Sequence, residues 1–304
     1  MGKLVNLRHL ILETYFDIQF PRGIGRLIAL RTISDFKVSG KDDSDGCTLG
    51  ELKNLNYLQG TLPIKRLENV VDVREAENAQ LKKKIHLHHL YLWFDKEYEK
   101  DRRMENDVLV LNSLESPPDL EFLSIDGYQG TIISPNWTMS LTKLKTLFLT
   151  ICSKLECLPP LGKLPFLESL QIWHVDGLKK VGVEFLGIES KNEKDNIIIF
   201  PNLKSLVFGF LEEWGVWIGI GGMREREDCV TIMPCLHYLR IHFCPKLKSL
   251  PDFLCTTPLK ELEIDYSPIL TKHCKKGTEE DMMIMCKKMV EKLYLGSMEN
   301  GKSH

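Results

Sequence analysis

Apolar residues recur along the chain in a short skeleton of the form LxxLxxLxL. The run from Leu141 to Leu158 is repeated, shifted by 23 positions, from Leu164 to Val181, while the polar residues between them change. This spacing fits neither a helix nor a simple amphipathic strand. It is typical of a leucine-rich repeat, in which a short strand is followed by apolar residues that turn the chain back over the core. A single repeat cannot bury its own apolar residues, so the pattern predicts a stack of repeats that share one core.

The same skeleton covers nearly the whole chain, in about ten repeats of unequal length. The further copies lie at 4–12, 27–36, 58–70, 85–94, 117–125, 200–208, 233–251 and 258–264. The sequence therefore predicts an α/β repeat solenoid over residues 1–270, a leucine-rich-repeat horseshoe. Its parallel sheet would line the concave face, and irregular or short helical segments would form the convex side.

Two segments outside the skeleton have helical signals. In 72–84, Asp72 is the expected N-cap, Glu75 would complete a capping box, and lysines 82–84 would lie at the negative end of the helix dipole. In the tail, 271–304, Thr278 is the expected N-cap of a helix. Its apolar face would contain Met282, Met285, Cys286, Met289 and Leu293. This second helix is interpreted as a cap over the last repeat, with a partner-binding helix as the alternative.

Alternation along each strand separates inward leucines from residues that face outward on the concave surface. Large rings occupy several outward positions, which is typical of protein-binding hot spots. The alternative is that these rings cover one another or pack under an adjoining segment. Charged outward residues follow on the last strands, where Glu261, Glu263 and Asp265 form an acidic stripe that would either orient a basic partner or be solvated. The expected protein-binding residues are Tyr91, Trp93, Phe148, Trp173, Arg240, His242, Glu263 and Asp265.

Composition excludes several classes of partner. The formal net charge of −2 gives no overall field that would attract nucleic acid or anionic lipid. No apolar run approaches the ~20 residues that cross a bilayer, and no signal peptide precedes the first repeat. The nine cysteines form no CxxC pair, so they are interpreted as reduced, small hydrophobic residues. We expect a cytoplasmic protein without nucleic-acid or membrane binding, with the nucleus as the alternative compartment.

Catalytic and metal chemistry have little support in the sequence. His237, His242 and Cys244 invite a zinc interpretation, but their positions would face in different directions. The sequence contains no GxxxxGK[ST] loop, no HExxH and no nucleophile elbow. We therefore predict no enzyme activity, no cofactor and no metal.

Five segments in a fixed order resemble the C-terminal repeat region of plant nucleotide-binding leucine-rich-repeat disease-resistance proteins of the coiled-coil type. These are "LENVVDVREAENAQLKKKIHLHHLYLWF" (67–94), "LEFLSIDGYQG" (120–130), "CLPPLGKLPFLESLQI" (157–172), "KKVGVEFLG" (179–187) and "FPNLKSLVFGFLEEW" (200–214). The resemblance implies a part in pathogen-effector perception. It also implies autoinhibitory contact with a nucleotide-binding switch module that this chain lacks.

The start of the chain, "MGKLVNLRHL", resembles a segment interior to such receptors, so we expect an uncovered first repeat and self-association through it. The alternative interpretations are that the chain is a truncated decoy, an inert receptor fragment, or a generic repeat scaffold such as a ubiquitin-ligase substrate adaptor. A secreted inhibitor of microbial enzymes would need a signal peptide and paired cysteines.

Overall fold

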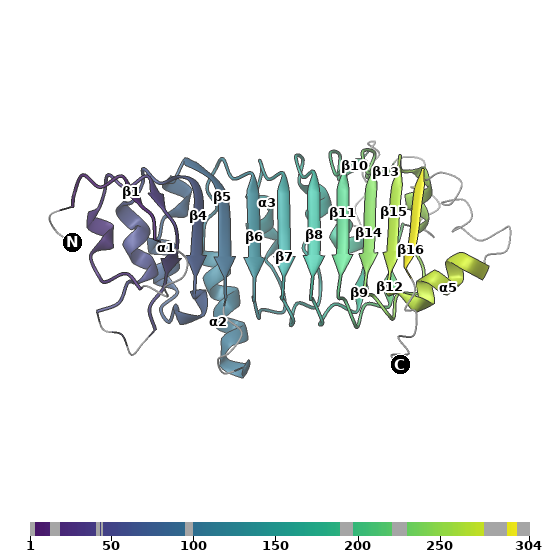
Figure 1. Cartoon of the computed structure of the whole chain (residues 1–304), viewed down its shortest axis with the longest axis horizontal. Helices are drawn as coiled ribbons and strands as arrows, with labels where there is room; N and C mark the ends of the chain where they lie inside the picture. Colours follow the sequence, from purple (N-terminus) through teal and green to yellow (C-terminus); the bar gives the residue numbers. More distant parts are fainter. Residues whose placement is uncertain are drawn as a thin grey trace, which may run out of the picture. The chain divides into compact units, whose positions relative to one another are not determined.

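The structure of the protein is a computed structural model that describes residues 4–12, 19–40, 43, 45–94, 100–188, 197–220, 230–276 and 291–296. The chain forms two compact units, Met1–Cys152 and Ser153–His304, which are described one at a time. In both units, short strands lie side by side and the chain between them forms turns and short helices (Figure 1).

Unit 1 contains a parallel sheet whose strands follow one another in chain order. The strands are β3 (Phe36–Lys37), β4 (Gln59–Lys65), β5 (His86–Trp93), β6 (Phe122–Asp126) and β7 (Thr146–Thr150). Ahead of them, β1 (His9–Leu10) pairs in parallel with β2 (Thr32–Ile33). The connecting segments contain η1 (Ile24–Arg26), η2 (Leu49–Asn54), η3 (Leu67–Asn69), α1 (Arg74–Asn78), η4 (Leu81–Lys83), α2 (Lys100–Ser113) and α3 (Pro135–Met139).

Unit 2 repeats this plan. Its sheet contains β8 (Ser169–Trp173), β11 (Ser205–Gly209), β14 (Tyr238–His242), β15 (Glu261–Asp265) and β16 (Lys292–Gly296), again parallel and in chain order. Short parallel pairs form between β9 (Lys180–Val181) and β12 (Val216–Trp217), and between β10 (Ile197–Ile199) and β13 (Val230–Ile232). The helical segments are η5 (Leu161–Lys163), α4 (Val183–Leu186), η7 (Asp252–Thr256) and α5 (Pro268–Lys276).

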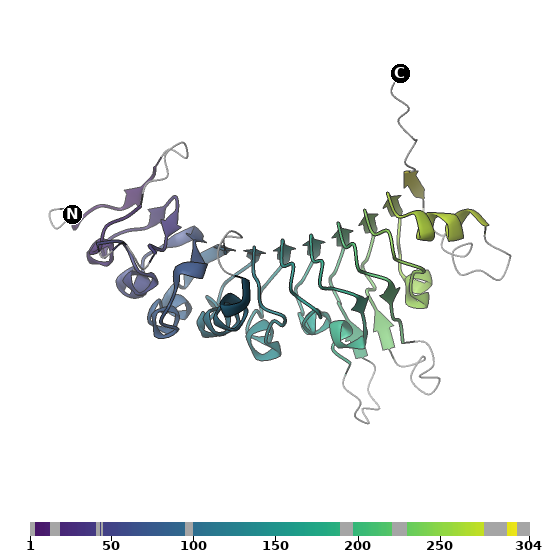
Figure 2. The ribbon, with the colours of Figure 1, turned by 90° about the horizontal axis from the view of Figure 1, so that it is seen from below.

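The leucine skeleton forms the core of each unit. Leu147 in β7 and Leu170 in β8 are 3% and 0% exposed, and the equivalent residues of neighbouring strands are also buried. Within each unit, the helical segments lie on one side of the sheet and cover this apolar layer, except α5, which lies beyond the end of the sheet at the level of β15 (Figure 2). The predicted α/β repeat solenoid, with a parallel sheet and short helical connections, is confirmed.

A left-handed residue follows the strands β6, β7, β8, β11, β14 and β15. Its φ angle is 73° at Gly127 and between 50° and 57° at the non-glycine positions, which are Ile151, His174, Phe210, Phe243 and Tyr266. The next residue then points inward again, as Cys152 and Cys244 do, with both side chains fully buried. The left-handed residue therefore turns the chain from the strand into the covering layer.

The helix predicted over 72–84 is wrong in its length. The α-helix α1 spans only Arg74–Asn78, and Gln80, with φ of 49°, separates it from the 3-10 turn η4. The N-cap is Val73 and not the expected Asp72, although Asp72 accepts a hydrogen bond from the Arg74 N–H at 3.0 Å. Lys84 is not at a solvated helix end, because its side chain is fully buried and its Nζ donates to the Leu52 carbonyl at 2.8 Å.

The C-terminal part of unit 2 differs from the expected tail. The helix α5 begins at Pro268, and β16 pairs in parallel with β15, so the sheet continues beyond residue 270. Leu293, expected on the apolar face of a capping helix, lies in β16 instead. The expected helix start at Thr278, with Met282, Met285, Cys286 and Met289, lies outside the described residues.

Candidate functional site

The outward strand residues form the open face of each unit, which is the side of the sheet away from the helical segments (Figure 2). In unit 1, strand pairing aligns Tyr91 with Ser124 and Phe148. The register also aligns Trp93 with Asp126 and Thr150. The period-two alternation therefore placed these residues in the rows that the structure shows.

Four rings form an aromatic cluster on the open face of unit 1: Tyr91, Trp93, Phe122 and Phe148. The ring centroids are 5.6 Å apart for Tyr91 and Trp93, 4.9 Å for Tyr91 and Phe122, and 5.2 Å for Phe122 and Phe148. All four are half-buried. The rings thus cover one another in part and still offer apolar surface to solvent.

The sequence reasoning missed Phe122, the ring that joins the other three. It occupies the first outward position of β6, whereas the expected site residues were taken from the centre and end of each strand. Counting every second residue back from the strand centre would have found it. Phe122 contacts Tyr91 of β5 and Phe148 of β7, so it joins the outward rings of these two strands into one surface.

A positive charge lies beside the aromatic cluster. The Nζ of Lys65 is 4.7 Å from the centroid of the Trp93 ring, and it also forms an ion pair with Asp35 at 2.9 Å. This arrangement is a cation–π contact at the edge of the open face. It holds the Trp93 ring in one orientation and gives the cluster a polar border.

Trp173, the fourth expected ring, belongs to unit 2. Its ring lies over Gly209 of the neighbouring strand, where a Cβ would come within 2.1 Å of the ring. Its Nε1 donates to the Gln171 side chain at 3.2 Å, and its centroid is 6.1 Å from that of His242. The missing side chain at Gly209 therefore lets the Trp173 ring lie flat against the sheet.

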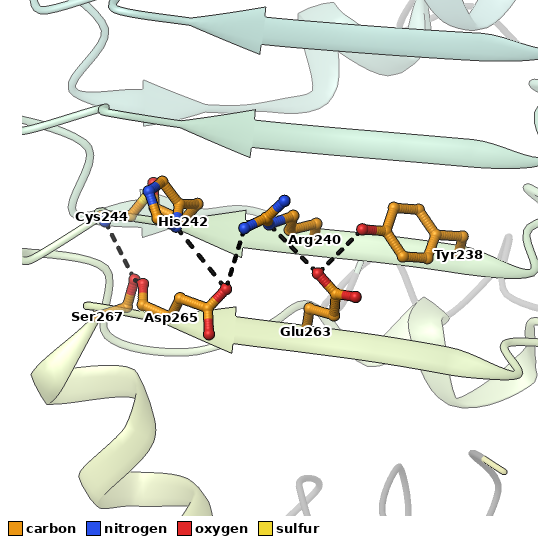
Figure 3. Close-up of polar contacts among 7 residues, drawn as sticks. All are labelled: Tyr238, Arg240, His242, Cys244, Glu263, Asp265 and Ser267. Carbon is orange, nitrogen blue, oxygen red and sulfur yellow. Dashed lines mark hydrogen bonds and ion pairs between the residues drawn. The ribbon is translucent and has the colours of Figure 1, made fainter. Parts of the chain in front are cut away.

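Two residues of the expected acidic stripe, Glu263 and Asp265, are paired across β14 and β15 (Figure 3), and the third, Glu261, lies 3.9 Å from Lys292 of β16. Arg240 lies 3.3 Å from Glu263 and 3.4 Å from Asp265, and His242 is 3.7 Å from Asp265. Tyr238 donates its hydroxyl to Glu263 at 3.0 Å. The stripe interpretation is therefore corrected, because the neighbouring strand supplies the countercharge. A basic partner would have to compete with Arg240.

This polar network also explains the titration of Tyr238. Burial, and then the hydrogen bond to the Glu263 carboxylate, raise the pKa of Tyr238 to about 12. A protonated hydroxyl is the donor that Glu263 needs. The network thus joins Tyr238 and Arg240 to the carboxylates of β15, while the buried Arg240 Nε and His242 Nδ1 make no hydrogen bond.

The residues considered for zinc do not converge. The Cys244 side chain is buried, and burial raises the pKa of its thiol to about 12, which disfavours the thiolate that binds metal. Among the described residues, the structure contains no group of three His, Cys, Asp or Glu side chains with the geometry to hold a metal ion.

An open hollow of about 720 Å³ lies near β2, β4 and β5 in unit 1. Ile33, Pro63, His86 and His88 are among its lining residues. None of the expected protein-binding residues lines it.

The family model described as R13L1/DRL21 LRRs matches residues 49–175. A disease-resistance protein of Arabidopsis thaliana is 35% identical over 74% of this chain and 16% of its own length. The RPP13-like protein 1 of the same plant is 32% identical over 69% of this chain and 20% of its own length. The disease resistance protein RGA2 of Solanum bulbocastanum is 32% identical over 81% of this chain and 24% of its own length. The chain thus spans a quarter or less of these relatives.

Within the part of the chain that the structure describes, no helix combines the length and apolar character needed to cross a bilayer.

Proposed function

We propose that this chain, which belongs to the leucine-rich-repeat regions of plant disease-resistance proteins, recognises other proteins in plant immunity and catalyses no reaction. The aromatic cluster of unit 1 is the main support. Half-buried rings held by strand register supply rigid apolar surface, and rigid surface loses little conformational entropy on binding. The buried leucine skeleton stabilises the fold independently of these outward residues.

The finer proposal concerns two protein partners. The open face of unit 1 contacts a nucleotide-binding switch module and keeps it inactive. A pathogen effector, or a host protein that the effector modifies, competes for the same surface and releases the module. Both events take place in the cytoplasm in this proposal, with the nucleus as the alternative compartment.

A direct binding measurement tests the location of this contact. The purified chain would be immobilised and the nucleotide-binding module of a related full-length resistance protein passed over it. The test variant combines Tyr91→Ala, Trp93→Ala and Phe148→Ala. The matched control is Val71→Ala, which removes a 55% exposed apolar side chain outside the open face of unit 1. Circular dichroism would confirm that both variants fold.

We expect the triple variant to weaken binding at least ~10-fold, because hot-spot aromatic residues each contribute more than ~1 kcal/mol. The control should bind like the unchanged chain. Equal binding by all three would place the contact elsewhere. Failure of the unchanged chain to bind would favour a decoy, an inert fragment or a substrate adaptor.

A further inference from the structure

A second row of rings, separate from the aromatic cluster, runs along one edge of the unit 2 sheet. It consists of the residue that directly follows β8, β11, β14 and β15, and we call it the edge ladder: His174, Phe210, Phe243 and Tyr266. Each has a left-handed backbone, with φ between 50° and 54°. None of these residues was expected as a site from the sequence.

The first three rings of the edge ladder stack on one another, and the fourth lies tilted beside them. The centroids are 4.4 Å apart for His174 and Phe210, with an interplanar angle of 11°. They are 5.2 Å apart for Phe210 and Phe243, at 27°. Phe243 and Tyr266 follow at 6.5 Å. A continuous row of rings therefore crosses the strand ends.

The edge ladder is accessible and held in place. Phe210 and Phe243 are half-buried, His174 is exposed, and Tyr266 is 44% exposed. His242 packs edge-on against both Phe210, at 5.0 Å, and Tyr266, at 5.5 Å. The exposed parts of these rings, at His174 and Tyr266 above all, remain available to a ligand.

Local backbone preference does not account for these residue types. The left-handed conformation is unfavourable for a side chain with a Cβ and is best occupied by Gly or Asn. The same backbone follows β6 and β7, at Gly127 and Ile151, so it belongs to the repeat, and the residue type is what distinguishes unit 2. In unit 2 this position holds four rings in succession, of which His174, Phe210 and Phe243 stack and Tyr266 is tilted, and this choice of residues indicates a role for the row as a surface.

We propose that the edge ladder binds a proline-rich peptide with at least one basic residue, in the polyproline II conformation and running across the strand ends. Neighbouring strands are ~4.8 Å apart, so alternate rings recur every ~9.6 Å. A polyproline II helix repeats every three residues, or ~9.3 Å. One face of the peptide can therefore meet every second ring, and proline-rich peptides are recognised by aromatic surfaces elsewhere.

Charge beside the edge ladder favours a basic peptide. Asp176 and Glu212 occupy the same turn position in consecutive repeats, two residues after His174 and Phe210, and both are exposed. Glu213, next to Glu212, already pairs with Lys246. These two exposed carboxylates follow the first two rings closely along the chain, and in this proposal they supply the countercharge for an arginine of the peptide.

The test uses the whole chain and three fluorescent nine-residue peptides. The first repeats Pro-Pro-Arg, the second Pro-Pro-Glu, and the third Gly-Ser-Arg, which keeps the charge and removes the polyproline conformation. Binding would be followed by fluorescence anisotropy. The ring variant combines Phe210→Asn with Phe243→Asn, because Asn tolerates the left-handed backbone. The control, Phe166→Asn, removes a 53% exposed ring of unit 2 that is outside the edge ladder.

We expect the Pro-Pro-Arg peptide to bind the unchanged chain and the Phe166→Asn control equally, and the ring variant at least ~10-fold more weakly. Asp176→Asn with Glu212→Gln should weaken the same peptide several-fold and remove its salt dependence. If the ring variant is poorly folded, Tyr266→Asn at the exposed end of the row should still weaken binding.

Three results would overturn this proposal. They are equal binding of the Pro-Pro-Arg and Gly-Ser-Arg peptides, absence of Pro-Pro-Arg binding to the unchanged chain, and binding that survives removal of the rings. The function proposed for unit 1 rests on other residues and another partner, so it stands or fails separately.

Discussion

At the residue scale, Lys84 shows how a repeat protein can bury a charge. The side chain is fully buried, and its Nζ donates to the Leu52 carbonyl of an adjacent turn. Burial lowers the pKa of Lys84 to about 8. The sequence predicted this lysine at the C-terminal end of a helix, together with two other lysines. The partner lies 32 residues away, and no local pattern indicates it.

Lys84 should make stability depend on pH. Its pKa in an unfolded chain is ~10.4, so between pH 8 and 10.4 the unfolded state holds a proton that the folded state has lost. The free energy of unfolding must therefore rise with pH in this window, by roughly 1–3 kcal/mol. Urea unfolding at pH 7 to 10.5 should show this rise in the unchanged chain relative to Lys84→Met.

Lys82→Met is the control, because that side chain is exposed and pairs with Glu115 at the surface. The unchanged chain and Lys82→Met should follow parallel pH profiles. A constant difference between the unchanged chain and Lys84→Met across the window would mean that Lys84 does not titrate there.

Two glycines of unit 1 have the same left-handed backbone conformation but differ in how closely neighbouring atoms pack against them. Gly127 and Gly60 have φ angles of 73° and 71°. A Cβ on Gly127 would lie 1.8 Å from the Phe94 carbonyl oxygen, whereas one on Gly60 would meet nothing within 4 Å. Gly60→Ala should therefore cost about 1 kcal/mol of stability, from the left-handed backbone alone.

Gly127→Ala should cost more than about 3 kcal/mol, because the Phe94 backbone must move as well. Thermal unfolding of the two variants provides the comparison. Similar losses in both would show that the Phe94 contact relaxes easily.

At the element scale, the strands could be predicted and the helices only in part. Inward leucines repeat with period two in strands such as β7 and β8, and that burial decides their register. The helical connections carry no such constraint. Gln80 adopts a left-handed conformation that cannot be predicted from its residue type. The helix therefore ends before Gln80, although its charges and expected N-cap indicated a longer helix. The edge ladder was missed for the same reason, since its positions are defined by backbone conformation rather than by hydropathy.

Adjacent residues of β8 should respond in opposite ways to a charge. Leu170 is fully buried, so Leu170→Asp places an unpaired carboxylate in the core and should cost more than about 3 kcal/mol. Gln171 faces the open side, and Gln171→Asp should change stability by less than about 1 kcal/mol. Urea unfolding of both variants checks this difference. Equal losses would contradict the inward and outward assignment of the strand.

At the scale of the whole molecule, the first repeat is less well buried than the others. The skeleton residue Leu4 is 53% exposed and Leu7, Leu10 and Leu12 are only half-buried, while leucines at skeleton positions of later repeats are nearly inaccessible. Val5, beside Leu4, is 49% exposed. An apolar surface of this kind favours association. The leucine skeleton alone led to the same expectation, because every repeat needs a neighbour.

We predict that the chain self-associates through this first repeat. Sedimentation velocity at increasing concentration should show dimers or larger species. Leu4→Glu combined with Val5→Glu should shift the distribution to monomer, whereas Tyr57→Glu, at a 63% exposed side chain elsewhere in unit 1, should not. A single monomer boundary for the unchanged chain at every concentration would contradict the proposal.

The matching register of β8, β11, β14 and β15 has a genetic consequence. Each of these strands is five residues long and pairs position for position with its neighbour. Recombination that exchanges, duplicates or deletes one whole repeat would therefore join two ends that already fit. The outward side chains would change in a single event while the buried leucine layer stayed continuous. New binding surfaces could therefore evolve without passing through protein variants that fail to fold.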